Sequence, residues 1–272
     1  MNDTICIIFF IIMIIMIFMW KNIIDFIFHK KEIKDHFINE GSSVIFLTPH
    51  ETQKIILDDK DNYYSTFFIY DYLARKVKSL DEYKDKIKNS PKELNENQKK
   101  RITKLISEID HQLLSYPYSY SYFSPKKCSK IKWKIGYTEG RNYEGGLPHT
   151  RGDIIMITNH VLDQSDEDLK GTLLHEKIHI YQKKNMDESE KYIEEQKYRK
   201  WKRRDEQDRV RANPDTDDYI YMNSKGEICK SVYNQNPKDL EDTKTYPNDS
   251  QESEHPLENM AITLEKIILS HL

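Results

Sequence analysis

The chain has 272 residues, of which 38% are hydrophobic and 32% charged, a composition typical of a globular domain with many solvated helix faces. Its formal net charge of -3 gives no whole-chain argument for nucleic-acid binding, so no nucleic-acid partner is expected. The three cysteines show no CxxC spacing, which argues against cysteine ligation of a metal. Cys128 and Cys229 could pair or stay as thiols.

The chain begins with an apolar run that is uninterrupted from Ile5 to Trp20. With a few flanking residues, such a helix can cross a hydrocarbon core of ~30 Å. The alternative is a cleaved signal peptide, but Asp3 precedes the run and bulky side chains fill it, where a signal peptide has basic and small residues. We therefore expect a single-pass transmembrane anchor at residues 1–28. Lysines follow the run and none precedes it, so the positive-inside rule predicts a cytosolic C-terminal domain.

A helical region is expected at residues 29–125. Capping boxes at Thr48–Glu51 and Ser90–Glu93 each predict the start of a helix. Aromatic residues between Tyr63 and Val77 indicate a buried helix, and apolar spacing from Ile102 to Leu114 predicts another. The simplest role for this region is a packing scaffold.

Strands and helices are both expected in residues 126–272. Alternating apolar residues predict strands at Ile131–Tyr137 and Asp153–Thr158, with a glycine-rich loop between them. Ser165 then caps a helix with apolar residues at helical spacing. A long charged helix is expected from about Glu188 to Arg211, and its basic part most simply forms a solvated face.

A hairpin and a last helix complete the pattern. Tyr219–Met222 and Ile228–Tyr233 flank an Asn-Ser-Lys-Gly turn, and a helix is expected from near Pro256 to Leu272. The order of elements predicts the α+β class.

The helix that follows Ser165 carries the sequence His175-Glu176-Lys177-Ile178-His179, an HExxH motif. Positions i and i+4 share one face of a helix, so both imidazoles can reach one metal ion. Glu176 projects beside them, close enough to take a proton from water at that ion. The alternative is a pair of surface histidines on an amphipathic helix.

A catalytic zinc site needs three protein ligands besides water. The extended motif HExxHxxGxxH is excluded, because Gln182 and Asn185 stand where that pattern has glycine and the third histidine. Glu258, in the first turn of the last helix, is the candidate third ligand, and Ala261 one turn later would let the two helices approach. His255 is the second candidate. The alternative role of Glu258 is an acid favoured by the helix dipole.

With Glu258 in a Pro-x-Glu-x-x-Ala setting, the HExxH motif resembles the gluzincin-type zinc metallopeptidases, most of all the membrane-bound branch whose third ligand sits in an ExxA(D) helix. The resemblance covers roughly a fifth of the chain. It implies a zincin-like catalytic domain at residues 126–272, with a small mixed sheet beside the motif helix. That family often has Asp four residues after the third ligand, where this chain has Ile262, so the partner that orients the histidines is left open.

The resemblance implies zinc-dependent hydrolysis of a peptide or protein substrate. Zn²⁺ on His175, His179 and Glu258 would lower the pKa of water, and Glu176 would act as general base. A Tyr or His is expected to stabilise the oxyanion. The open candidates for that role are His255, Tyr233, Tyr246 and His149.

In families of this kind an edge strand pairs with extended substrate, and the predicted strand at Asp153–Thr158 is in the corresponding position. Arg151 before it could meet a substrate carboxylate, although a surface salt bridge is the simpler role. Two other functions stay open. One is a catalytically inactive, membrane-anchored protein of zincin fold with a structural or interaction role. In the other, the basic segment from Lys197 to Arg211 binds a partner and the HExxH motif is coincidental.

Overall fold

The computed structural model describes residues 44–248 and 253–271, and these described residues belong to one compact unit. The expected membrane anchor, residues 1–28, lies outside the described residues. Among the described helices, none is long and apolar enough to cross a membrane.

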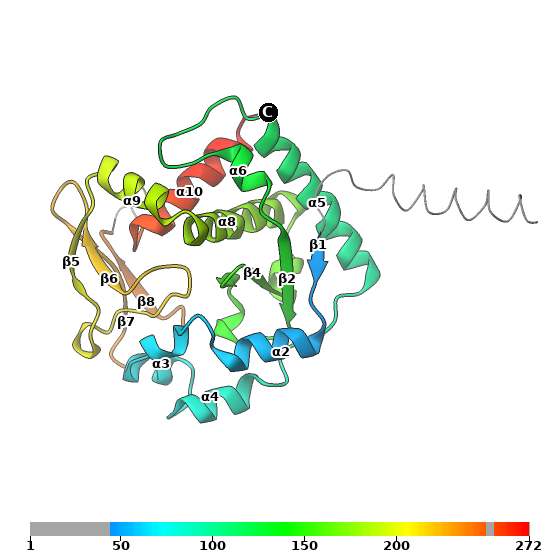
Figure 1. Cartoon of the computed structure of the whole chain (residues 1–272). Coiled ribbons are helices and arrows are strands. Elements are labelled where there is room, and N and C mark those ends of the chain that lie inside the picture. Colours follow the sequence, from blue (N-terminus) through cyan, green and yellow to red (C-terminus); the bar gives the residue numbers. More distant parts are fainter. Residues whose placement is uncertain (1–43, 249–252, 272) are drawn as a thin grey trace, which may run out of the picture. The chain divides into compact units, whose positions relative to one another are not determined.

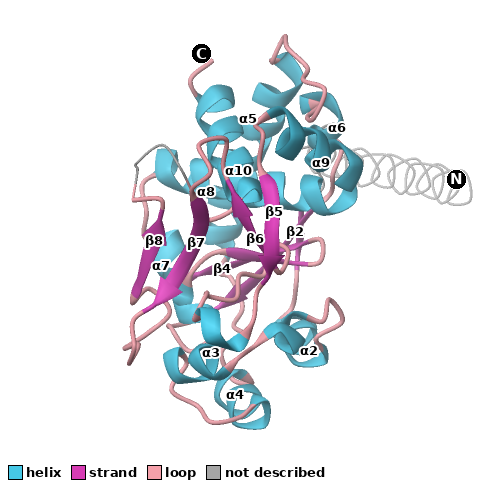
Figure 2. Ribbon diagram, turned by 90° about the vertical axis from the view of Figure 1, so that its left-hand side faces the viewer, coloured by secondary structure: helices cyan, strands magenta, loops and turns pink. Residues whose placement is uncertain are grey.

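The described chain is of the α+β class, with two small sheets and helices packed against them (Figures 1 and 2). The helices are α2 (Pro49–Asp58), α3 (Ile69–Ala74), α4 (Leu80–Ile87), α5 (Glu96–Ser115), α6 (Pro125–Ser129), α7 (Asn159–Leu162), α8 (Asp166–Lys184), α9 (Met186–Glu195) and α10 (Pro256–Leu269). The strands are β1 (Val44–Phe46), β2 (Trp133–Thr138), β3 (His149–Arg151), β4 (Ile154–Thr158), β5 (Arg199–Arg203), β6 (Tyr219–Met222), β7 (Ile228–Tyr233) and β8 (Thr243–Tyr246). Short 3-10 helices occur at Tyr63–Thr66, Glu144–Gly146 and Glu206–Asp208.

The first sheet has the order β1-β2-β4-β3, in which β1, β2 and β4 are parallel and β3 is an antiparallel edge strand. Its two faces are covered by different helices, and β4 alternates between them. Ile155 and Ile157 belong to the core shared with α5, α8 and α10, whereas Met156 belongs to the core under α2 and α4. The strand β1 comes from the region that was expected to be helical, and it pairs with β2 from Val44 to Phe46.

The helix α8 lies between the first sheet and α10 (Figure 1). It begins as predicted, because the Ser165 hydroxyl accepts a hydrogen bond from the N–H of Asp168. Inside the motif, Lys177 is buried on the side away from the cleft, where its Nζ donates to Asp110 at 3.1 Å and lies 3.9 Å from the centroid of the Trp133 ring. These contacts fix the rotation of α8 about its axis, and so the direction of the two histidines.

The second sheet is antiparallel, with the order β5-β6-β7-β8. It contains the predicted hairpin, with Asn223 at the turn accepting hydrogen bonds from the backbone N–H groups of Lys225 and Glu227. The predicted last helix is also confirmed as α10. Cys128 and Cys229 are both buried and are not bonded to each other.

The prediction of one long charged helix from about Glu188 to Arg211 is wrong. The helix α9 stops at Glu195, and Lys197 takes a left-handed backbone conformation with φ 58°. The edge strand β5 follows and pairs with β6. Glu, Lys and Arg favour a helix locally, but the segment after α9 has no apolar stripe to bury, so its backbone is paired with β6 instead. Charged side chains are common on such exposed edge strands.

Two predictions in the first half also need correction. The segment from Tyr63 to Val77 is a 3-10 turn followed by the short helix α3, not one helix. The capping box at Ser90–Glu93 is wrong, because Pro91 forms a β-bridge with Thr138 and the helix begins after Asn95, whose side chain caps Gln98. The box at Thr48–Glu51 and the helix that contains Ile102 to Leu114 are confirmed.

Candidate metal centre and cleft

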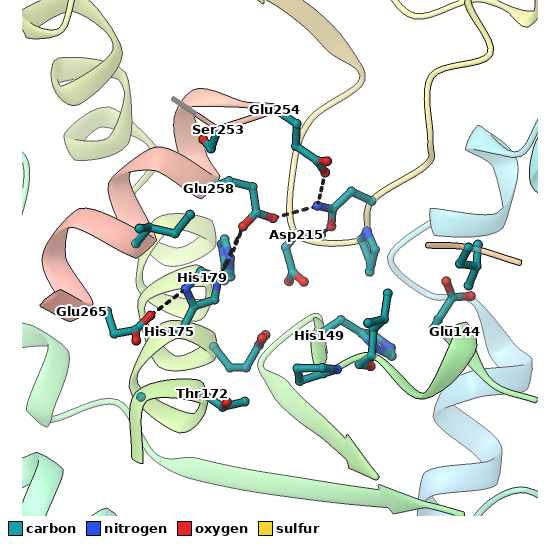
Figure 3. A pocket seen from close by; sticks show the side chains of 18 of the residues that line it. Glu144, His149, Thr172, His175, His179, Asp215, Ser253, Glu254, Glu258 and Glu265 are labelled. Atoms are coloured by element: carbon teal, nitrogen blue, oxygen red, sulfur yellow. Dashed lines mark hydrogen bonds and ion pairs between the residues drawn. The ribbon is translucent and has the colours of Figure 1, made fainter. Parts of the chain in front are cut away.

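Three side chains predicted as metal ligands converge at one point between α8 and α10 (Figure 3). The Nε2 atoms of His175 and His179 are 3.0 Å apart. The Oε2 atom of Glu258 lies 3.3 Å from the first of these nitrogens and 3.4 Å from the second. Zinc bound tetrahedrally at 2.0–2.1 Å would hold its ligand atoms about 3.3 Å apart. The spacing of the three atoms is therefore that of one face of a zinc tetrahedron.

The other ring nitrogen of each histidine faces an acceptor. Nδ1 of His175 lies 3.2 Å from Oε2 of Glu265, and Nδ1 of His179 lies 2.8 Å from Oε1 of Gln182. The Gln182 amide is oriented by its own Nε2, which donates to the carbonyl of Leu257 at 2.8 Å. With Nδ1 of each ring donating to its acceptor, the two Nε2 atoms point at each other and at a carboxylate, so in the neutral rings their lone pairs repel. A cation relieves that repulsion, so the donor set fits a metal ion.

Glu265 and Gln182 were not identified as site residues from the sequence. Glu265 follows Glu258 by seven residues, so the two carboxylates lie on the same face of α10, two turns apart. Glu265 is thus the histidine partner that the sequence comparison at Ile262 had left open. A helical-spacing signal was therefore present, but it could be interpreted only after α10 was known to face α8. Gly171 makes room for this carboxylate, because a Cβ atom there would lie 2.8 Å from Oε1 of Glu265.

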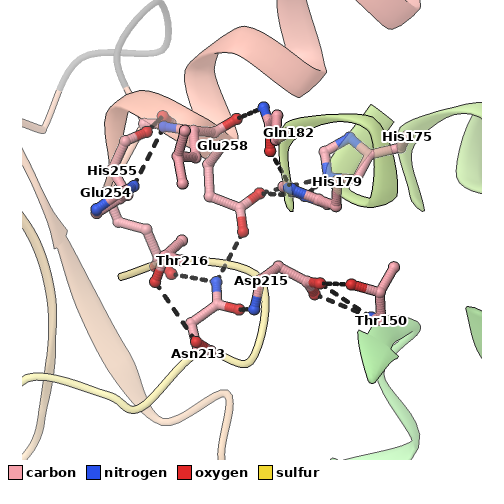
Figure 4. A network of polar contacts seen from close by, with 12 residues as sticks. Thr150, His175, His179, Gln182, Asn213, Asp215, Thr216, Glu254, His255 and Glu258 are labelled. Carbon is pink, nitrogen blue, oxygen red and sulfur yellow. Dashed lines mark hydrogen bonds and ion pairs between the residues drawn. The ribbon is translucent and has the colours of Figure 1, made fainter. Parts of the chain in front are cut away.

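Glu258 is held from its other side by a loop that precedes β6 (Figure 4). The side-chain amide of Asn213 donates to Oε1 of Glu258 at 2.7 Å, which turns Oε2 towards the histidines. Burial opposes the charge of Glu258, but the two histidines beside it hold its pKa well below the usual range. His255, the second candidate ligand, instead caps α10, since its Nδ1 accepts from the N–H of Leu257 while its Nε2 contacts Asp217.

The pKa of His175 reflects the negative surroundings of the site. Burial disfavours the charged imidazole, but the hydrogen-bonded carboxylates of Glu258 and Glu265 outweigh burial and raise the pKa of His175 to about 11. These carboxylates favour positive charge at this point, whether it is carried by a proton or by a metal ion.

Glu176 lies in the same turn of α8 and is 3% exposed. Its Oε2 atom is buried, and no hydrogen-bond partner reaches it within the described residues. Burial first, and then the negative charge of Asp215, raise the pKa of the Glu176 carboxyl to about 8. A carboxyl with a pKa near neutrality beside a metal-ligand set is suited to take and return a proton.

These residues line a cleft of about 860 Å³. Figure 3 shows α8 and α10 on one side of it and Glu144 on the opposite side. The other lining residues used below are Glu167, Asp168, Gly171, His149, Asn213, Asp215, Ile262, Glu265 and Leu269.

Among the four candidates for oxyanion stabilisation, only His149 lines the cleft. It lies on the edge strand β3, where its Nδ1 is 3.0 Å from the carbonyl oxygen of Leu147 and its buried Nε2 has no partner among the described residues. Burial lowers the pKa of His149. Tyr233 is buried elsewhere, donating to Asp71, and Tyr246 is exposed on β8. His255 is occupied as the cap of α10.

The edge-strand role expected of Asp153–Thr158 changes, whereas Arg151 forms salt bridges, as its simpler role predicted, although they are buried and not at the surface. The strand, β4, is internal and pairs with β2 and β3, so the edge next to the cleft belongs to β3. The Arg151 guanidinium is buried and forms ion pairs with Asp59 and Asp61. It ties β3 to the loop after α2 and is not free to meet a substrate carboxylate.

Comparison with models of protein families, with curated proteins and with solved structures finds no match to this chain.

Proposed function

We propose that this protein is a zinc-dependent peptidase with a zincin-like catalytic domain. The observation that carries the proposal is the convergence of two imidazole lone pairs and one carboxylate at the spacing of a zinc tetrahedron, with the buried Glu176 in the same helical turn. His175, His179 and Glu258 would hold the metal. The donor set of two nitrogens and one oxygen leaves a fourth position for water or substrate, as catalytic zinc requires.

The chemistry follows from the positions of the side chains. Zinc bound there would polarise a peptide carbonyl and make water more acidic. The Glu176 carboxylate would accept a proton from the attacking water and then deliver it to the nitrogen of the departing amine. Asn213 and Glu265 hold the ligands in place from either side of the metal position. His149, whose Nε2 lacks a partner, is the candidate to contact the reacting carbonyl or the leaving amine.

The proposal also includes the membrane anchor, the cytosolic location and the peptide substrates expected from the sequence. A membrane anchor at residues 1–28 would hold the catalytic domain on the cytosolic side, with peptides or proteins as substrates. The non-enzymatic alternative, a zincin-like protein with a structural or interaction role, predicts bound zinc without peptide cleavage.

The proposal is tested on the purified full chain by measuring zinc by mass spectrometry and cleavage of a peptide library. We expect one zinc per chain, lost in His179→Ala. Glu176→Gln is expected to keep zinc but to lose at least about 100-fold in turnover, because the general base is removed. Glu190→Gln, which changes an exposed acid on α9 outside the cleft, is the matched control and should keep both properties.

Two results would contradict the proposal. Stoichiometric zinc in His179→Ala would remove the motif from the metal site. Zinc-loaded wild-type protein that cleaves nothing in the library would favour the non-enzymatic alternative.

A further inference from the structure

The outer edge of β3 is already occupied. Within β3, His149 and Arg151 are opposite Met156 and Ile154 of β4. The backbone N–H and C=O groups of Thr150, which lies between them, point away from β4. The N–H of Thr150 donates to Oδ1 of Asp215 at 2.9 Å. Its carbonyl accepts from Nζ of Lys183 at 3.2 Å.

The next position that would face outward is Pro148, which has no N–H. Binding of a peptide as an added strand needs alternating donors and acceptors on the open edge. Along β3 and the residue before it, the only outward N–H is that of Thr150, which Asp215 already binds. The sheet therefore offers an incoming peptide no free donor next to the cleft.

The segment that closes this edge is built into the site. Asp215 is 5% exposed, and Lys183 binds both its carboxylate, at 3.1 Å, and the carbonyl of Pro214, at 2.8 Å. Two residues earlier, Asn213 holds Glu258, and its Oδ1 accepts from the N–H of Asp215 at 2.9 Å. Figure 4 shows the segment between β3 and α10. Moving it away would separate the buried Asp215 carboxylate from the partly exposed Lys183 and would release a candidate metal ligand.

We propose that the segment Asn213–Asp215 stands in the place of a substrate strand, so that the peptidase acts on peptides held at the metal and by their side chains, not by main-chain pairing with β3. The inference rests on the proposed function. Its consequence is a substrate class of short peptides, because residues that extend beyond the cleft find no strand edge on which to pair.

The test uses Glu176→Gln protein loaded with zinc, which should bind peptides without cutting them. Peptides of four to ten residues are titrated, each beside analogues in which one backbone amide is replaced by an ester, which removes a single N–H. We expect the affinity to stop rising once the peptide is longer than about six residues. Each ester is expected to change the affinity less than about threefold, since no backbone N–H of the peptide pairs with the sheet. Losses above about tenfold at alternate positions would overturn the proposal, since that period of two marks an added strand.

A second experiment frees the edge of β3 and asks whether main-chain pairing then appears. Lys183→Met with Asp215→Ala removes both charges together and frees the edge at Thr150, so ester sensitivity and a gain with length are expected to appear. The matched control is Lys184→Met with Asp153→Ala, the neighbouring ion pair, whose N–O distance is 3.4 Å and which does not contact Thr150. Protection of the Thr150 amide against hydrogen exchange should be lost in the first variant and kept in the second. Protection that survives in the first variant would overturn the assignment of this amide to Asp215.

The two proposals fail differently. If peptides bind as described but the zinc-loaded wild type does not cut them, the peptidase proposal is wrong and the binding mode stands. If peptides are cut but bind with alternate ester losses, only the inference about β3 is wrong. If no peptide binds, both are overturned.

Discussion

Glu265 and Gly171 act as a unit at the candidate metal centre. Gly171 lies one turn before His175 and Glu265 lies two turns after Glu258, and the absence of a side chain at Gly171 lets the carboxylate reach Nδ1 of His175. Partners that orient metal-bound histidines typically contribute 10- to 100-fold to metal affinity. We therefore expect Glu265→Ala to weaken zinc binding by about that factor, as measured by competition with a chromophoric chelator.

Gly171→Ala should have a similar effect in the wild type, because its Cβ would displace the carboxylate. In the Glu265→Ala background it should add little, so the double-mutant cycle reports the coupling directly. Lys266→Ala, an exposed change on the same helix, is the control. Additive losses would show that the glycine affects zinc through the helix rather than through Glu265.

At the scale of single residues, the sequence was sufficient to predict which side chains lie together where their spacing within one helix decides the geometry. His175, Glu176 and His179 lie together because they share one turn of α8, and the third predicted residue, Glu258, does reach them. Asn213 and Asp215 could not be inferred in the same way. Their roles depend on a loop whose path is fixed by contacts with β3, α8 and α10, and nothing in the local sequence specifies these distant partners.

Among the elements, the contact between α8 and α10 is the one on which the site depends. Ala261 is fully buried one turn after Glu258, at the position where the sequence suggested a close approach of the two helices. Ala261→Leu is expected to destabilise the fold by about 1–3 kcal/mol through overpacking and to weaken zinc binding by moving Glu258. Denaturant unfolding and zinc titration measure the two effects.

Lys266→Leu is the control for that substitution, since it adds an equally large apolar side chain on the exposed side of α10. An Ala261→Leu protein with unchanged stability and zinc affinity would mean that a larger side chain fits between α8 and α10 without overpacking. Glu258 would then be positioned mainly by Asn213.

The elements also show where prediction from sequence stops. Regular apolar spacing correctly identified α5, α8, α10 and the hairpin, because each buries a periodic face. β1 and β5 were missed for different reasons. β1 forms by pairing with β2, which is distant in the sequence. β5 pairs with β6, the next strand along the chain, but it presents charged side chains to solvent, so local propensity favoured a helix there.

Over the whole molecule, the buried acid Glu144 is one of the links between the helices of the first half and the cleft. Glu144 accepts hydrogen bonds from the hydroxyls of Tyr63 and Tyr83 and forms an ion pair with Arg75. Burial opposes its charge, but the Arg75 guanidinium outweighs burial and lowers the pKa of Glu144 from 4.5 to about 2. Because the pKa is lower in the folded state, the stabilisation is full above pH 4.5 and is lost as the pH falls towards 2.

We therefore expect the free energy of unfolding to fall by on the order of 3 kcal/mol across that interval through this group alone. Glu144→Gln should flatten this part of the pH dependence while lowering stability at pH 7, as chemical denaturation at a series of pH values can show. Asp166→Asn, which changes an exposed acid paired with Arg101, is the control and should leave the slope nearly unchanged. An unaltered slope in Glu144→Gln would place the acid sensitivity elsewhere.

The charge of the cleft predicts the kind of peptide that it selects. Several lining carboxylates are neutralised, Glu144 by Arg75, Asp215 by Lys183 and Glu254 by Arg211. Between α8 and α10 the acidic side chains of the cleft are not matched by basic ones. Within the described residues, no lysine or arginine is ion-paired with the lining carboxylates Glu167, Asp168 and Glu265, and the partly buried side chains of Ile262 and Leu269 lie beside them.

A lysine or arginine of the substrate fits this part of the cleft, since its aliphatic stem can cover the two apolar side chains while its charge meets the carboxylates. We expect kcat/KM for a peptide with lysine next to the scissile bond to exceed that of its glutamate counterpart by about tenfold at low ionic strength. The preference should shrink in 0.5 M salt, where the screening length is only about 4 Å. Glu167→Gln with Asp168→Asn should reduce it, whereas Glu93→Gln with Glu96→Gln, at the start of α5, should not. Equal rates for the two peptides at low salt would show that the carboxylates of Glu167, Asp168 and Glu265 do not contact the substrate.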